Sequence, residues 1–171
     1  MQVLSATTQD WARLAEAALV DGPVCVRHAA PPETLQALMA EADDAQGWRE
    51  VDEDGARLSE KPAGGLAVEA LAALGLGAPD GVRWLRHRPG EHGAPVWPPG
   101  GRGFVLDLVD LPRSEDGGLL LHVDADGRAV GRRAEAGALA LFDPSSPPVR
   151  TLLSPRAPRA LLSVVGTFRP S

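Results

Sequence analysis

The sequence contains very little of several residue types, and each shortage excludes a class of protein. Its single cysteine, Cys25, excludes an internal disulfide and a zinc site built from several cysteines. Tyrosine is absent, and with it a phenolic acid that active sites often use. No apolar run approaches a membrane span, and the N-terminus lacks the basic start and apolar stretch of a signal peptide, so we expect a cytoplasmic protein.

Basic residues are also in the minority. The 17 lysines and arginines are outnumbered by 23 acids, which gives a net charge of -6. Nucleic acids and anionic membranes both favour a basic face, so neither is expected as a partner. With 171 residues and 44% hydrophobic content, the chain is long and apolar enough to form one domain with a buried core.

Hydrophobic spacing divides this domain, 1–171, into a helical or mixed part, 1–80, and a strand-rich part, 81–171. Apolar residues three and four positions apart predict helices over 7–22, 31–46 and 65–77, with a short strand over 22–29. The polar, turn-rich stretch 47–65 is typical of an irregular hairpin.

From residue 82 the pattern changes to short strands separated by glycine, proline, aspartate and serine turns. The predicted strands lie within 82–88, 103–111, 117–127, 128–143, 149–154 and 159–169. Several short strands at close spacing indicate an antiparallel sandwich or barrel. We therefore predict a mainly β fold of the α+β class, in which N-terminal helices pack against a C-terminal β-barrel.

Three segments of the C-terminal half carry a resemblance to a known family: "LRHRPGEH", "GFVLDLVDLPRSEDGGLLL" and "GALALFDPSSPPVRTLLSPRAPRALLSVVGTFR". In this order they resemble the iron- and 2-oxoglutarate-dependent oxygenases, in particular the compact prolyl-hydroxylase-like branch. The N-terminal "DGPVCVRHAAPPETLQALMAEA" resembles that branch's opening strand and helix. The resemblance covers most of the chain and implies a double-stranded β-helix, a jelly-roll or cupin-like barrel, buttressed by helices.

The same resemblance implies that the usual metal site is missing. Such oxygenases hold iron with a His-x-Asp pair after the Pro-Gly turn and a later histidine, which leaves open positions for cosubstrate and dioxygen. The resemblance places Val96 at the first histidine and Pro98 at the aspartate. The later histidine falls between Pro147 and Arg150, where the sequence has none. None of these side chains is an ordinary iron ligand.

A rearranged metal site is the alternative. The only His-x-Asp in the chain is formed by His122 and Asp124, on the predicted Gly-Gly strand, and no histidine follows it. A new site would have to combine His87 or His92 with this pair. A lone His-x-Asp is a weak signal, and a hydrogen-bonded or solvated histidine is the competing interpretation for each position.

Strand alternation assigns two of these histidines to the barrel interior. Leu85 and His87 share a face of the strand before the Pro-Gly turn, and the resemblance aligns His87 with a tyrosine that faces the cosubstrate. Leu120, His122 and Asp124 share a face that we also expect to point inward. Inward imidazoles need hydrogen-bond partners and titrate near neutral pH. We weigh a functional and a structural role evenly for His87 and favour a structural one for His122.

Two further residues are candidates for a ligand pocket. Arg159 matches the position from which a basic residue pairs with the far carboxylate of 2-oxoglutarate, and a guanidinium suits that carboxylate. The alternative for Arg159 is a rim arginine paired with a surface acid. Trp97 lies beside the positions where the metal ligands are missing. It either fills the space of the missing metal or lines a ligand pocket, and the first interpretation is the simpler one.

Three functions remain open at this point. The first is a pseudoenzyme without a cofactor, which uses the barrel cavity for binding. Its ligand would be an organic anion such as 2-oxoglutarate, a peptide or a protein. A protein partner would be either an active partner subunit or a second copy of this chain. Its pocket would be lined by Val96, Trp97, Pro98 and Arg150. The second is an Fe(II) oxygenase with the rearranged ligands. The third is a metal-independent enzyme whose acid or base is drawn from His87, Glu91 and His92.

Overall fold

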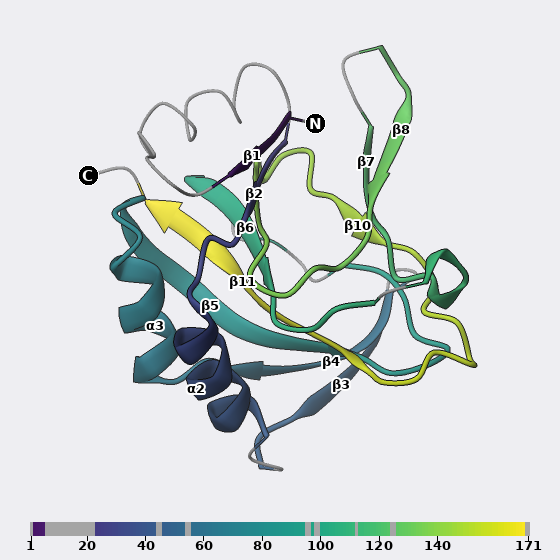
Figure 1. The fold of residues 1–171 in the computed structure, drawn as a ribbon, viewed down its shortest axis with the longest axis horizontal. Coiled ribbons are helices and arrows are strands. Elements are labelled where there is room, and N and C mark those ends of the chain that lie inside the picture. Colours follow the sequence, from purple (N-terminus) through teal and green to yellow (C-terminus); the bar gives the residue numbers. More distant parts are fainter. Residues whose placement is uncertain are drawn as a thin grey trace.

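The computed structural model describes residues 2–5, 23–43, 46–53, 56–94, 97, 100–111, 113–123 and 126–169, and the structural statements below concern these residues. Two β-sheets of unequal size form most of the fold, and helices α2 (Pro32–Ala42) and α3 (Gly65–Ala72) lie against the larger sheet (Figure 1). Neither helix is long and apolar enough to cross a membrane.

The larger sheet has eight strands in the order β1-β2-β9-β6-β11-β5-β4-β3. β1 and β2 run parallel, and every other neighbouring pair is antiparallel. In this order the strands are β1 (Gln2–Ser5), β2 (Val24–Arg27), β9 (Leu139–Phe142), β6 (Arg102–Asp107), β11 (Leu161–Arg169), β5 (Ala78–His87), β4 (Ala56–Pro62) and β3 (Arg49–Glu53).

The smaller sheet has three antiparallel strands in the order β10-β7-β8. They are β10 (Val149–Arg150), β7 (Leu120–Val123) and β8 (Ala129–Arg132), and a short 3-10 turn, η1 (Ser114–Asp116), precedes β7. In Figure 1 the β7–β8 hairpin projects from the body of the molecule. The two sheets and the buttressing helices confirm the predicted mainly β, jelly-roll fold.

Alternation along the central strands gives the larger sheet two different faces. On β6, Phe104 and Leu106 point toward the helices, whereas Val105 and Asp107 point toward the smaller sheet. On β11, Val164 packs on the helix side in the same way. Because both faces of these strands are covered, their sequences are almost continuously apolar, and a single aspartate stands out in them.

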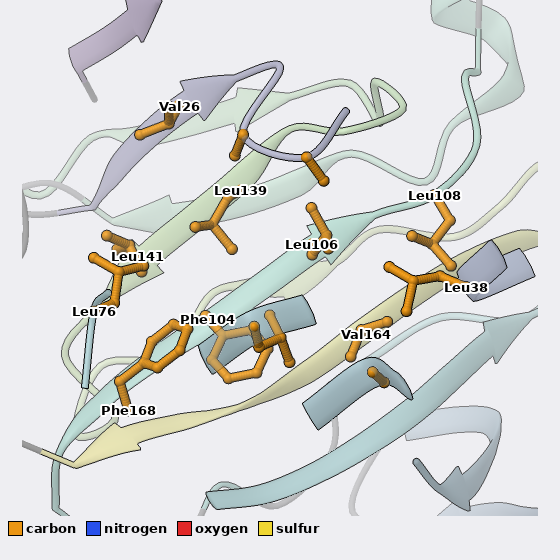
Figure 2. Packing of buried hydrophobic residues seen from close by; sticks show 14 of the residues in the cluster. Val26, Leu38, Leu76, Phe104, Leu106, Leu108, Leu139, Leu141, Val164 and Phe168 are labelled. Atoms are coloured by element: carbon orange, nitrogen blue, oxygen red, sulfur yellow. The ribbon is translucent and has the colours of Figure 1, made fainter. Parts of the chain in front are cut away.

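The main hydrophobic core lies between the larger sheet and the two helices (Figure 2). Phe104 and Phe168 are fully buried with ring centroids 4.6 Å apart, and Leu38 of α2 and Leu71 of α3 cover the sheet from the helix side. A smaller apolar cluster between the two sheets contains Leu58, Leu85, Val105, Leu120, Ala140, Phe142 and Val165.

The structure corrects several of the predicted elements. The stretch 47–65 holds a regular antiparallel hairpin, β3–β4, which joins the larger sheet. The predicted strand 128–143 is two strands in different sheets, β8 and β9, because the chain leaves the hairpin and crosses to the other sheet between them. β5 begins four residues before the predicted start at Val82, and β1 was not predicted. The predicted helix 7–22 lies outside the described residues.

Truncation of the central aromatic residue tests this core. We expect Phe104→Ala to lower the free energy of unfolding by about 3–5 kcal/mol, because the cavity forms where both neighbouring strands are fixed. Leu66→Ala is the matched control, since Leu66 is 43% exposed on α3 and should change stability by less than about 0.5 kcal/mol. Denaturant unfolding measures both, and equal effects would contradict the packing described here.

Candidate functional site

A buried ion cluster lies between the two sheets, centred on Asp107 of β6. The Asp107 side chain is completely buried, and its carboxylate pairs with the guanidinium of Arg150 and, at 2.9 Å, with that of Arg132. The hydroxyl of Ser163 donates to Asp107 Oδ1 at 2.9 Å. Arg150 also donates to the carbonyl oxygen of Gly118 at 3.1 Å. The carboxylate therefore accepts three hydrogen bonds, two at Oδ1 and one at Oδ2.

The elements that supply these groups explain why they meet. Asp107 and Ser163 lie opposite each other on the neighbouring strands β6 and β11, on the face turned away from the helices. Arg150 on β10 and Arg132 on β8 both lie opposite Leu120 of β7, one on each side. These two arginines therefore point from the smaller sheet toward the larger one, and the cluster joins the two sheets.

Burial makes this cluster electrostatically demanding. Desolvation lowers the pKa of Arg150, and the neighbouring Asp107 carboxylate opposes that shift. Two guanidinium groups share one carboxylate, so the cluster carries a surplus of one positive charge. A charged group in such surroundings is retained only when its hydrogen bonds are satisfied, and Arg150 meets this condition through Asp107 and Gly118.

His87 of β5 lies beside the cluster and is 2% exposed. Its pKa is lowered to about 4, first by desolvation and then by the positive charge of Arg150, so the imidazole is neutral at pH 7. In the neutral form Nε2–H donates to the carbonyl oxygen of Gly93, 3.2 Å away. The acceptor Nδ1 is buried and has no hydrogen-bond partner among the described residues.

The space between the sheets is nearly filled. Its cavity measures only ≈ 10 Å³ and is lined by Leu85, His87, Gly93, Ala94, Trp97, Val105, Leu120, Pro148, Arg150, Ser163 and Val165. The ring of Trp97 packs edge-on against Phe142, with centroids 4.8 Å apart, and Trp97 Nε1 has no described partner. A volume of about 10–15 Å³ is what one water molecule needs, so 2-oxoglutarate does not fit this cavity as it stands.

The structure brings together only part of the predicted site. His87, Trp97 and Arg150 line the cavity, and Leu85 and Leu120 face it as the alternation predicted. Val96, Pro98 and Asp124 lie outside the described residues, so their predicted positions stay predictions.

Other candidates lie away from the cavity. His122 is buried on β7 but does not line it. The Glu91 carboxylate accepts a hydrogen bond from the backbone N–H of Arg88 at 2.7 Å and so closes the Pro-Gly turn. His92 is half-buried and forms backbone hydrogen bonds with Arg57. Arg159 is exposed in the loop before β11 and does not line the cavity. Its predicted role as the carboxylate partner stays a prediction.

The architecture is similar to solved structures of iron- and 2-oxoglutarate-dependent enzymes. A Pseudomonas putida prolyl-4-hydroxylase superposes with a TM-score of 0.76 and 22% identity, over 95% of this chain and 100% of that one. The non-heme alpha ketoglutarate dependent epimerase SnoN from nogalamycin biosynthesis superposes with a TM-score of 0.66 and 14% identity, over 94% of this chain and 85% of that one. HygX from Streptomyces hygroscopicus, solved with nickel, 2-oxoglutarate and hygromycin B, superposes with a TM-score of 0.65 and 10% identity, over 95% of this chain and 88% of that one.

These likenesses define the fold. No family model matches the chain, and no curated protein matches it in sequence. The resemblance inferred from the sequence is confirmed at this level: the chain has the double-stranded β-helix of the iron- and 2-oxoglutarate-dependent oxygenases, with a prolyl hydroxylase among its structural neighbours.

This fold implies an iron ion, and the described residues do not fit one. A non-haem iron site of this kind needs two imidazoles and one carboxylate on one face with open positions. Here the Asp107 carboxylate is occupied by two guanidinium groups, and the adjacent Arg150 is a cation without an acceptor atom. His87 offers one imidazole nitrogen. Within the described part of the chain, no three His, Cys, Asp or Glu side chains come together in a way that could hold a metal.

Three members of the ion cluster were not predicted from the sequence, namely Asp107, Arg132 and Ser163. One signal for Asp107 was present, since it is the single charged residue in the apolar run 103–109 and shares a face with Val105. Nothing in the sequence indicates that Arg132 is part of the cluster. Its strand is half-exposed, and the next residue, Arg133, is an exposed arginine. Only the pairing of β8 with β7 shows which of the two points inward.

Removal of the buried arginine tests the cluster. We expect Arg150→Leu to lower the free energy of unfolding by about 3 kcal/mol, because it leaves a buried carboxylate with one guanidinium fewer. In the double variant Asp107→Leu/Arg150→Leu, the loss should be smaller than the sum of the two single losses, since both partners are gone. Exposed Arg156→Leu is the control for loss of an arginine. Additive losses in a urea double-mutant cycle would contradict the pairing.

The depressed pKa of His87 predicts a pH dependence of stability. Between pH 6.5 and about 4 the unfolded chain binds a proton at this position and the folded chain does not, so stability falls as the pH falls through this window. The contribution is about 3 kcal/mol, fully present above pH 6.5. His87→Gln should flatten this part of the curve, whereas exposed His28→Gln should leave it unchanged. Equal slopes for parent and His87→Gln in urea unfolding would refute the assignment.

Proposed function

We propose that this chain is a non-catalytic protein of the oxygenase fold that acts by binding, with a fixed arginine in the part of the barrel where the fold implies a metal ion. The observation that carries the proposal is Arg150, which is buried against Asp107 between the two sheets. A guanidinium has five donors and no acceptor, so it repels a metal cation and cannot ligate it. The same ion pair supplies the connection between the two sheets.

The nearly filled interior supports recognition by the outer surface. A cavity of ≈ 10 Å³, lined by Trp97 and Arg150 among others, leaves no room for a cosubstrate together with a substrate side chain. Binding of a peptide or protein partner needs no such room. Among the ligands expected from the sequence, a peptide or protein is therefore favoured over one held inside the barrel.

One observation favours a second candidate, a small organic anion that enters the barrel. The cluster of Asp107, Arg132 and Arg150 has one surplus positive charge, and Trp97 Nε1–H is a buried donor without a described partner. A carboxylate would satisfy both. This candidate requires the Trp97 side chain to move, because the space beside it is too small for a carboxylate.

Titrations with ferrous iron and 2-oxoglutarate test the proposal. After anaerobic incubation and desalting, we expect far less than stoichiometric iron by elemental analysis, and no consumption of 2-oxoglutarate. A 2-oxoglutarate-dependent oxygenase treated in parallel serves as the positive control. Stoichiometric iron would overturn the proposal in favour of the rearranged site. A rise in melting temperature with succinate, lost in Trp97→Ala, would support the organic anion.

A further inference from the structure

The outer face of the smaller sheet is apolar, although it faces solvent. The register places Val149, Leu121 and Gly131 side by side across β10, β7 and β8, and Val123 beside Ala129. Val123 and Val149 are 61% and 49% exposed, and Leu152, just after β10, is 52% exposed. Outward positions of a half-covered antiparallel sheet are normally polar, so this row is unusual for a surface that stays in water.

The apolar row reaches the free edge of the sheet because of a glycine. A Cβ atom at Gly131 would lie 2.8 Å from Leu121 Cδ2 and 3.4 Å from Leu119 Cδ1, so these leucine side chains lie across the β8 backbone. A larger residue at position 131 would lift them off. The surface formed by Leu119, Leu121, Val123, Ala129, Gly131 and Val149 is called the hairpin face below.

β8 is also an open edge strand within the described residues. It pairs with β7 on one side, and neither the sheet ladders nor the isolated bridges give it a partner on the other. The opposite edge is closed, because Arg150 of β10 bridges Gly93. In Figure 1 the β7–β8 hairpin projects from the main body, and Ala129 and Gly131 of β8 are exposed. Unpaired N–H and C=O groups on such an edge are a template for an added strand.

The charge around this edge indicates what kind of strand could be added to it. The stretch 128–133 contains three arginines and no acid, in a chain whose net charge is -6. Arg128 and Arg133 are exposed at its two ends, while Arg132 points inward to Asp107. Asp126 lies 3.8 Å from Arg128, but both side chains are more than 70% exposed, so this pair contributes little. A second copy of β8 would bring arginine against arginine, whereas an acidic segment would be attracted.

We propose that β8 and the hairpin face bind an extended acidic peptide segment of a partner protein, which adds to the smaller sheet as a fourth strand next to β8. Its backbone pairs with the open edge of β8, alternate apolar side chains extend the hairpin face, and acidic residues at its ends meet Arg128 and Arg133. This mode of recognition combines main-chain hydrogen bonds with side-chain selectivity. The inference deepens the proposed function by naming the partner, and it rests on that function.

The probe is a fluorescein-labelled peptide of alternating valine and threonine with glutamates at both ends, titrated against the full chain by fluorescence anisotropy. We expect saturable binding that weakens about tenfold in Arg128→Glu/Arg133→Glu, because two attractive pairs become repulsive. The same variant should prefer a peptide with lysines at both ends. Arg57→Glu/Arg156→Glu changes the charge equally at exposed positions elsewhere and should leave the affinity unchanged.

Backbone pairing is tested separately from charge. A probe with N-methylated alternate amides keeps every side chain but cannot pair with β8, and we expect its binding to be lost. Bound peptide should also slow hydrogen exchange of the β8 amides. No binding by the parent chain, equal affinity for the methylated probe, or no response to charge reversal would each overturn the inference.

Other outcomes identify a different occupant or a different failure. Concentration-dependent self-association that Val123→Asp abolishes, together with no binding of the peptide, would assign the hairpin face to a second copy and refute the peptide. If the peptide fails while iron is also absent, the non-catalytic proposal stands and its partner binds elsewhere. If iron binds stoichiometrically and the peptide binds too, only the non-catalytic proposal fails.

Discussion

The pairing of Asp107 with two arginines is the constraint on which the rest of this structure depends. The smaller sheet has only three short strands, and one of them, β10, has two residues. Strands this short contribute little stability of their own, so the sheet depends on its contacts with the rest of the protein. Arg150 and Arg132 attach it to β6, and Ser163 ties the same carboxylate to β11. A buried charge that loses its partner is costly, so the cluster allows one alignment of the two sheets and penalises the others.

The same constraint accounts for the chemistry of the barrel. In this barrel the Asp107 carboxylate is engaged by two guanidinium groups and one hydroxyl group. With Arg150 nearby, His87 is held neutral and its Nε2–H is committed to Gly93. Trp97 and Phe142 occupy the remaining space. These interior groups thus contact and stabilise one another.

The sequence predicted the fold and singled out one of the four cluster residues, Arg150, for a physical reason. The order of turns and alternating strands from residue 82 onward was enough to identify the jelly roll, because each strand's pattern is local. Arg150 was predicted to line the pocket because it lies where the resemblance places the later iron-binding histidine. Its partner Asp107 was not, because the two are 43 residues apart and meet only when β6 and β10 face each other. The hairpin β3–β4 was underestimated because its strands are rich in charged residues and lack a regular alternation of apolar ones.

The ion cluster and the hairpin face are two consequences of one register. On β7, β8 and β10, successive residues point to opposite sides, so the row of Arg150, Leu120 and Arg132 inside fixes the row of Val149, Leu121 and Gly131 outside. A slip of one residue would bury the apolar row and expose both arginines. The Asp107 carboxylate prevents that slip, since it has to be met by a guanidinium. The carboxylate that pairs with both arginines therefore also keeps the apolar row of the smaller sheet turned toward solvent.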